Sequence, residues 1–398
     1  MNISTVTRKH LFDLPENIVY LDGNSLGCLP RGVAGRASKT IEGEWGGQLI
    51  RAWNTASWMS LPQRVGDRIA RLVGAPDGSV ATGDTLSIKV YQAVAAALRM
   101  RPGRKVIVSD SGNFPTDLYM VRGLLQTLDA GYELRTPEPE NVADAIDESV
   151  AAVLLTHVDY RTGRMHDMAD MTRRAQAAGA AMIWDLAHSA GALPLDLAGC
   201  GTEFAVGCTY KYLNGGPGAP AFIYVRPDIV SAVEPALAGW MGHDAPFAME
   251  LHYRPAMSTE RLRVGTPPIV QLAILDEALN VWDGVELEDV RAASIELSEL
   301  FIAEVERRCP QLNLASPRDP AARGSQVSFA FANGYEAMQA LIDRGVIGDF
   351  RAPDIMRFGF TPLYVDRDDV LVAAGKIEEV IGGELWRDTR YSVRSRVT

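Results

Sequence analysis

The chain of 398 residues lacks the features of a secreted, disulfide-bonded or membrane-spanning protein. It has four cysteines and no CxxC pair, so neither a disulfide framework nor a metal site of the zinc-ribbon type is indicated. No run approaches the roughly 18 uncharged apolar residues of a transmembrane helix, and the first twenty residues lack the apolar core of a secretory signal. We expect a cytoplasmic protein with reduced thiols and no membrane partner.

Positive charge is also scarce. Lysine and arginine number 39 against 50 aspartates and glutamates, which gives a net charge of −11. Proteins that bind nucleic acid usually carry a clustered basic face, so the composition argues against such a partner. Hydrophobic residues make up 47% of the chain, which is enough to bury the core of one large domain and one smaller one.

The order of apolar runs predicts an α/β fold. From about residue 79 to residue 226, short runs such as AAVLLTHV alternate with helix-like segments at 87–100, 116–132 and 167–180. Nearly continuous apolar runs are typical of strands buried on both faces of a mainly parallel sheet. We assign residues 61–268 to this large domain. A long helical stretch at about 269–308, followed by further strands and helices, predicts a smaller α+β domain over 269–398. Residues 1–60 are expected to pack with it.

Polar residues that follow apolar runs are the first candidates for chemistry, because ligands of open α/β sheets bind beyond the carboxyl ends of the strands. Asp185 and His188 follow AAMIW, and Lys211 follows EFAVGCTY. Taken singly, each has an ordinary explanation, since an aspartate there can cap a helix, a histidine can be structural, and a lysine on a turn is usually solvated. A strand-end aspartate is also suited to holding a ring nitrogen protonated, and a desolvated lysine becomes a nucleophile or a base.

Two further strand-to-helix turns complete a pattern. GDTLSIK (83–89) places hydroxyls and amides at a helix N-terminus, which favours a phosphate, although Thr85 or Ser87 can serve only as a cap. SDSGNFPTDLY (109–119) supplies the aromatic Phe114 and the carboxyl of Asp117. A phosphate site, an aromatic plate, an aspartate and a later lysine, in that order, predict pyridoxal 5′-phosphate (PLP) as cofactor.

The same stretches resemble the kynureninases, within the fold type I, aminotransferase class V group of PLP enzymes. The resemblance spans residues 20 to 364 and rests on YLDGNSLGCLP, LTHVDYRTGRMHDM, WDLAHSAGALPLDL, GCTYKYLNGGPGAPAF and MRFGFTPLY. It implies hydrolysis of L-kynurenine to anthranilate and L-alanine in tryptophan catabolism and NAD biosynthesis. The chain departs from the family pattern at Gly112 and at Leu86, where backbone amides would supply the phosphate contact.

The resemblance also implies roles for individual residues. Lys211 would form the Schiff base, Asp185 would pair with the pyridine nitrogen, and Tyr210 is the candidate for later proton transfers, although hydrogen bonding to the phosphate is an equal alternative for it. Trp240 and Thr266 would reach the phosphate from the neighbouring subunit of a homodimer. The full set of expected cofactor-binding residues is Leu86, Ser87, Phe114, Pro115, Thr116, Asp117, Thr156, Asp185, His188, Tyr210, Lys211, Trp240 and Thr266.

Substrate contacts are expected from three places. Arg357 interrupts the apolar run IMRFGF; it is either an edge-strand surface arginine or a planar fork that grips an α-carboxylate, and the resemblance favours the second role. Trp53 (with Trp58 nearby) and Gly265 suit an aromatic ring. Because no donor is dedicated to a ring hydroxyl, kynurenine is favoured over its 3-hydroxy derivative.

Two other functions remain open on the sequence. A cysteine desulfurase would share the lysine, aspartate and histidine but needs a reactive cysteine, and none of Cys28, Cys200 and Cys208 lies in a glycine-rich loop with basic neighbours. A non-catalytic PLP-binding regulatory domain joined to a DNA reader would need a basic helix-turn-helix, and the acidic composition opposes it.

Overall fold

A computed structural model describes residues 6–394 of the chain. Its largest sheet has seven strands in the order β2-β8-β7-β6-β5-β3-β4, and β8 alone runs antiparallel to its neighbours. The predicted α/β domain with a mainly parallel sheet is therefore confirmed. The strands are β2 (Val80–Thr82), β3 (Val106–Val108), β4 (Glu133–Arg135), β5 (Val150–Thr156), β6 (Ala181–Asp185), β7 (Phe204–Gly207) and β8 (Phe222–Val225).

Helices cover both faces of this sheet, which explains its continuous apolar runs. In β6, Ile183 packs in one apolar cluster with helices α4 and α5, while Met182 and Trp184 pack in another with α3, α6 and α7. Every residue of β5 is buried. The helices are α3 (Leu61–Leu72), α4 (Leu86–Met100), α5 (Pro115–Leu128), α6 (Met168–Ala177) and α7 (Ile269–Ala278).

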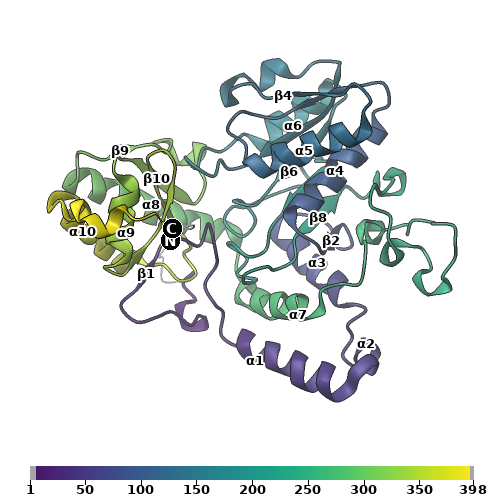
Figure 1. The fold of residues 1–398 in the computed structure, drawn as a ribbon, viewed down its shortest axis with the longest axis horizontal. Helices are drawn as coiled ribbons and strands as arrows, with labels where there is room; N and C mark the ends of the chain where they lie inside the picture. Colours follow the sequence, from purple (N-terminus) through teal and green to yellow (C-terminus); the bar gives the residue numbers. More distant parts are fainter. Residues whose placement is uncertain (1–5, 395–398) are drawn as a thin grey trace.

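A second, antiparallel sheet of four strands, ordered β12-β13-β10-β9, lies beside the first with its own helices (Figure 1). The helical stretch expected over about 269–308 is divided into two helices: α7 ends at Ala278, and Gly284, with a φ of +68°, lies between it and α8. The elements of this part are α8 (Leu287–Arg308), β9 (Asn313–Leu314), β10 (Gln326–Ala330), α9 (Gly334–Ile342), β11 (Val346–Ile347), β12 (Asp349–Arg351), β13 (Ile355–Gly359) and α10 (Arg367–Gly382).

Residues 6–60 contact both parts of the molecule. Strand β1 (Val19–Tyr20) pairs in parallel with β11. Helix α1 (Val33–Ser38) packs on α7, continues as a π-helix over Lys39–Gly46, and leads towards α2 (Ala52–Thr55) along the lower edge of Figure 1. The domain boundaries predicted from the sequence stay predictions.

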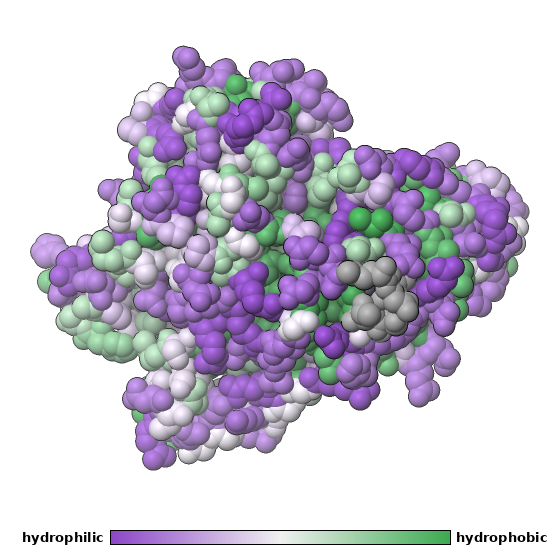
Figure 2. All heavy atoms as spheres, turned by 180° about the vertical axis from the view of Figure 1, so that it is seen from behind, coloured by the Kyte–Doolittle hydropathy of each residue, from purple (hydrophilic) through white to green (hydrophobic). Residues whose placement is uncertain are grey.

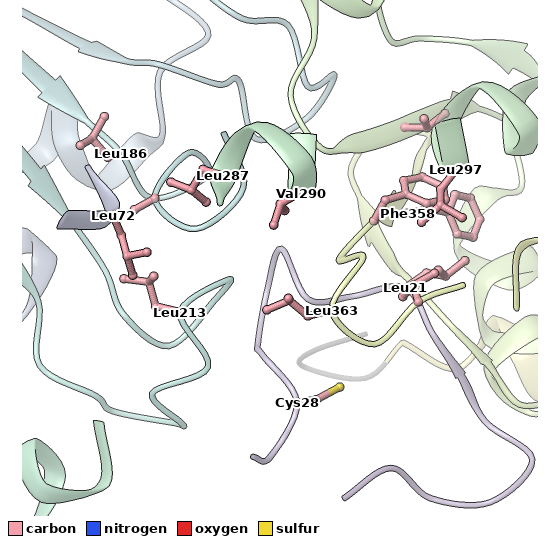
Figure 3. Close-up of a cluster of buried hydrophobic side chains, with 14 of the residues drawn as sticks. Leu21, Cys28, Leu72, Leu186, Leu213, Leu287, Val290, Leu297, Phe358 and Leu363 are labelled. Carbon is pink, nitrogen blue, oxygen red and sulfur yellow. The ribbon is translucent and has the colours of Figure 1, made fainter. Parts of the chain in front are cut away.

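One apolar cluster joins the two sheets. It contains Leu186 and Leu213 from the large sheet and its loops, Val290 from α8, Phe358 from β13 of the small sheet, and Leu363 from the turn after β13 (Figure 3). Burial of this many side chains fixes the two parts against each other. The outer surface is mostly hydrophilic in the view of Figure 2, and no helix within residues 6–394 has the length and apolarity to cross a membrane.

Candidate active site

The carboxyl ends of neighbouring strands bring the predicted residues to one edge of the large sheet. β5 and β6 pair in register, so that Thr156 lies beside Asp185 at the last rung. β7 pairs with the other side of β6 and ends at Gly207, and the chain then turns through Tyr210 to Lys211. Parallel pairing thus collects an aspartate, a threonine and a lysine from three separate stretches of sequence.

Lys211 and His188 form a hydrogen-bonded pair. The Lys211 Nζ lies 3.0 Å from the His188 Nε2. Burial, together with the positive charges of Lys211, Arg357 and Arg351, lowers the pKa of His188 well below its usual value of 6.5. The ring is therefore neutral, and its Nε2 accepts a hydrogen bond from the lysine. Its buried Nδ1 has no hydrogen-bond partner within residues 6–394.

Asp185 and Asp117 form a buried carboxyl pair. Asp185 Oδ1 accepts a hydrogen bond of 2.8 Å from the amide of Ala187, and the Thr156 hydroxyl lies 3.4 Å from Oδ2. Burial, and then the nearby charge of Asp185, raises the pKa of Asp117 well above its usual value. Burial also raises the pKa of Asp185, with the charge of Lys211 acting against that rise. Because the pKa of Asp117 is raised more strongly, the proton of the pair belongs to Asp117 and the negative charge to Asp185.

Phe114 presents an aromatic face beside these carboxyls. It caps the start of α5, where Pro115 and Thr116 form the first turn, and its side chain is 42% exposed. The Asn113 amide oxygen accepts hydrogen bonds from the Thr156 hydroxyl and from the Phe114 amide. The ring meets Tyr160 edge to face, with 5.2 Å between centroids. This network holds the exposed ring at the same sheet edge as Asp185.

The N-terminus of α4 is the place where the sequence predicted an anion site. Thr85 is the N-cap and accepts a hydrogen bond from the Ile88 amide. The structure therefore shows the capping role that the sequence suggested for Thr85. Leu86 and Ser87 follow at the first two helical positions and are half-buried. The unpaired amides of this turn are suited to a phosphate.

Tyr210 and the cysteines of the site hold their protons. Burial raises the pKa of the Tyr210 hydroxyl, and the neighbouring Cys208 raises it further. The Lys211 Nζ lies 5.7 Å from the centre of the Tyr210 ring. Burial also raises the pKa of the Cys208 and Cys200 thiols, and that of Cys28 to about 12. None of these three carries the reactive thiolate that a desulfurase requires.

Arg357 lies inside the small sheet rather than on its surface. Its strand, β13, is paired on both sides, and the side chain is 1% exposed. The edge-strand surface alternative is therefore wrong. Asp349 grips the guanidinium through both oxygens, with a distance of 2.7 Å from Nε to Oδ1, and Nη1 donates to the Tyr160 carbonyl oxygen at 2.6 Å. This last contact connects Arg357 to the ring that touches Phe114.

Four expected residues have no hydrogen bond, ion pair or ring contact with Lys211, Asp185 or Phe114 within residues 6–394. Trp53 packs edge to face on Trp58, whose indole donates to Glu44 at 2.8 Å; both belong to the segment around α2 (Figure 1). Trp240 packs on Phe247 with 5.6 Å between ring centres. Gly265 and Thr266 are exposed.

The residues at the sheet edge fit PLP. A carboxylate for the ring nitrogen, an exposed aromatic ring, a helix N-terminus and an amine all face one region. One buried polar atom there, His188 Nδ1, has no hydrogen-bond partner in the part of the chain that the structure describes. Buried polar atoms are normally satisfied, so its state is consistent with a polar ligand at this edge.

The sheet and the site define a fold type I PLP enzyme-like α/β architecture. Solved structures agree: a C-DES variant with glycine covalently linked to its PLP cofactor has a TM-score of 0.82 at 16% identity, covering 93% of this chain and 99% of that one. The cysteine desulfurase CsdA from Escherichia coli has a TM-score of 0.79 at 20% identity, covering 96% and 99%. At such identities the likeness concerns the fold alone.

Sequence comparison is more specific. The chain is 50% identical to a kynureninase of Burkholderia pseudomallei over 97% of its own length and 95% of the relative's, and 48% identical to one of Pseudomonas fluorescens with the same coverage. The family model of the kynureninase C-terminal domain matches residues 290–377, and that of the DegT/DnrJ/EryC1/StrS aminotransferases matches residues 79–201. The chain belongs to the kynureninase family.

Several side chains at the site were not among the sequence candidates. Ser25 bonds to both Arg357 and Asp349, and Asn113 positions Thr156. Asp22 lies near the same arginine. The sequence feature that could have indicated Asp22 and Ser25 is the DGNSLG stretch. It is part of the family resemblance, but the sequence does not indicate which residues its side chains contact.

Proposed function

We propose that this chain hydrolyses L-kynurenine to anthranilate and L-alanine with PLP as cofactor. The observation that carries the proposal is the placement of Lys211 against a neutral His188, beside the buried Asp185 and at the edge where β5, β6 and β7 end. The family membership supports the choice of substrate. L-kynurenine is proposed over its 3-hydroxy derivative because Trp53 and Gly265, the residues expected at the substrate ring, include no donor dedicated to a ring hydroxyl.

When bound, PLP supplies an electron sink for the bonds broken at the substrate amino acid. Side chains of this chain supply the charge pairing and the proton transfers. Asp185, kept charged by its protonated neighbour Asp117, holds a proton on a ring nitrogen. The Lys211 amine acts as the base at the α-carbon, and His188, being neutral, does not compete for that proton at neutral pH.

Binding and later proton transfer fall to other residues. Arg357 orients the α-carboxylate, and Phe114 offers its face to the cofactor ring. The Tyr210 hydroxyl keeps its proton at neutral pH because burial raises its pKa, so it can give that proton to the β-carbon after water has cleaved the Cβ–Cγ bond. The remaining proposed cofactor contacts are Leu86, Ser87, Pro115, Thr116 and Thr156.

We also propose a homodimer with shared sites. Two exposed apolar groups support it: one near α2 (Trp45, Leu49 and Ile50) and one within residues 240–251 (Trp240, Phe247, Met249 and Leu251, the last fully exposed). Large exposed apolar side chains in such number mark an interaction surface. Trp53, Trp240, Gly265 and Thr266, which have no hydrogen bond or ring contact with Lys211 in the described chain, would then reach the partner's site. A cytoplasmic location stays a prediction.

The proposal is tested by incubating purified, PLP-loaded protein with L-kynurenine. Anthranilate fluorescence and alanine should appear in equal amounts, and prior reduction with borohydride should abolish both. Release of sulfide and alanine from cysteine, without anthranilate from kynurenine, would favour a desulfurase. Light scattering at several protein concentrations tests the dimer, which a mass of one chain throughout would contradict.

A further inference from the structure

The segment DGNSLG (22–27) lies against both halves of the site. The Gly27 amide donates to the Tyr210 carbonyl oxygen at 2.8 Å, and a Cβ on Gly27 would collide with the Lys211 carbonyl oxygen. Ser25 Oγ accepts from Arg357 Nη2 at 2.7 Å and donates to Asp349 Oδ2 at 2.6 Å. One short stretch of the N-terminal region thus touches the lysine turn and the arginine that would hold the substrate carboxylate.

The charged side chains around Arg357 do not balance one another. Arg357 and Arg351 both bind the single carboxylate of Asp349; Arg351 Nη2 lies 2.6 Å from its Oδ2. The pKa of Asp349 is lowered, chiefly by Arg357 acting against the effect of burial, so this carboxylate stays charged. Two cations and one anion leave one net positive charge, which matches one incoming carboxylate.

Asp22 is a second carboxyl near these arginines. Its Oδ1 is buried and has no hydrogen-bond partner among residues 6–394. Burial and the charge of Asp349 raise the pKa of Asp22 to about 7, against the opposing effects of Arg357, the Ser25 hydroxyl and Arg351. The charged and titratable groups that face it are Asp349, Arg351, Arg357, Tyr20 and Tyr212.

We propose that Asp22 is a positioning residue that acts through Arg357 and Arg351: its neutral carboxyl leaves the arginine pair with one positive charge for the substrate α-carboxylate, and its ionised form cancels that charge. The inference rests on the proposed amino-acid substrate. Binding of the carboxylate is then accompanied by uptake of a proton at Asp22, since an ionised Asp22 and the incoming carboxylate repel each other.

The decisive variant is Asp22→Asn, which mimics the neutral carboxyl at every pH. The measured quantity is the ratio of wild-type to variant kcat/KM for kynurenine, because titrations of the substrate and of other groups cancel in the ratio. The ratio should be constant below about pH 7 and should fall by up to about tenfold per pH unit above it. The fall should come from a rise in the wild-type KM, with kcat unchanged. Asp13→Asn, at an exposed carboxylate paired with Arg31, should keep the wild-type pH profile. A ratio that does not change with pH overturns the inference.

A second measurement needs no variant. Calorimetry of the holoenzyme in buffers of different ionisation enthalpy measures the number of protons taken up per site when a ligand binds. The two ligands compared are L-alanine, which has an α-carboxylate, and ethylamine, which lacks it. At pH 7 to 8, alanine should take up about half to one proton more per site. Equal uptake overturns the inference. If kynurenine yields no anthranilate at any pH, the proposed function fails instead, and the comparison of alanine with ethylamine still decides the role of Asp22.

Discussion

The Lys211 amine lies 3.0 Å from a histidine ring that is neutral and whose other nitrogen, His188 Nδ1, is buried and unpartnered within the described chain. Because the pKa of His188 is lowered well below 6.5, its ring is neutral in the neutral range and its Nε2 accepts a hydrogen bond from Lys211. The histidine therefore holds the amine in place, which agrees with the proposed role of Lys211 as the base.

Replacement of Lys211 by alanine should abolish turnover while the fold is retained. Loss of a positioned base alone costs about a hundredfold to ten-thousandfold in rate, and loss of the amine also removes the covalent attachment of PLP that borohydride makes permanent. Mass spectrometry after reduction tests the attachment. Lys105→Ala, at a lysine stacked on Tyr132, is the matched control and should still be modified at Lys211.

Asp185→Asn should weaken PLP binding. A hydrogen bond to a charged group contributes roughly 1.5–3 kcal/mol, which corresponds to about a tenfold to hundredfold weaker dissociation constant. Titration of apoprotein with PLP, followed by visible absorbance, measures it. An unchanged dissociation constant, together with unchanged kinetics, would contradict the pairing of Asp185 with the ring nitrogen.

Asp117→Asn should change how the stability of the apoprotein depends on pH. The folded state raises the pKa of Asp117 well above the unfolded value of 3.8. The folded chain therefore keeps a proton that the unfolded chain loses, and the wild-type free energy of unfolding falls as the pH rises above about 4. Asparagine does not titrate. Melting temperatures of the two apoproteins should diverge in favour of the variant between about pH 5 and about pH 8; a constant difference would refute the buried pair.

Hybrid dimers test whether the sites are shared. Lys211→Ala and the double variant Trp240→Ala/Thr266→Ala should each be impaired as homodimers. Random mixing makes half of the dimers hybrid, and each hybrid has one intact site, so activity should return to about a quarter of the wild-type value. Co-expression with two affinity tags isolates the hybrids. Activity no higher than that of the impaired parents would show that each chain completes its own site.

The sequence predicted those parts of the site that depend on local pattern. Asp185 and Lys211 each follow a short apolar run in the sequence. Because β5, β6 and β7 pair in parallel, the ends of these runs lie at the same edge of the sheet, and the two side chains are close together. Thr85 at the start of α4 was likewise recognisable as a cap. Such inferences succeed because strand ends and helix starts are encoded within a few residues.

Contacts between distant segments were not predictable in this way. Ser25 and Asp349 are 324 positions apart, and no periodicity relates them. The break between α7 and α8 depends on Gly284 at a left-handed φ, within a stretch whose apolar residues continue across it. Trp58 has an aromatic side chain suited to a substrate pocket, but its indole is bonded to Glu44 and buried. In each case the outcome depends on tertiary packing.

The pairing of β1 with β11 affects the order in which the chain can fold during synthesis. Val346 lies far behind its partner Val19 in the chain. At roughly 5–20 residues per second, the interval between their synthesis is on the order of twenty seconds to a minute. Throughout that time the segment carrying Asp22 and Ser25 has no strand to join, so the large sheet can form during translation, whereas the proposed carboxylate site is assembled only after Val346 has emerged.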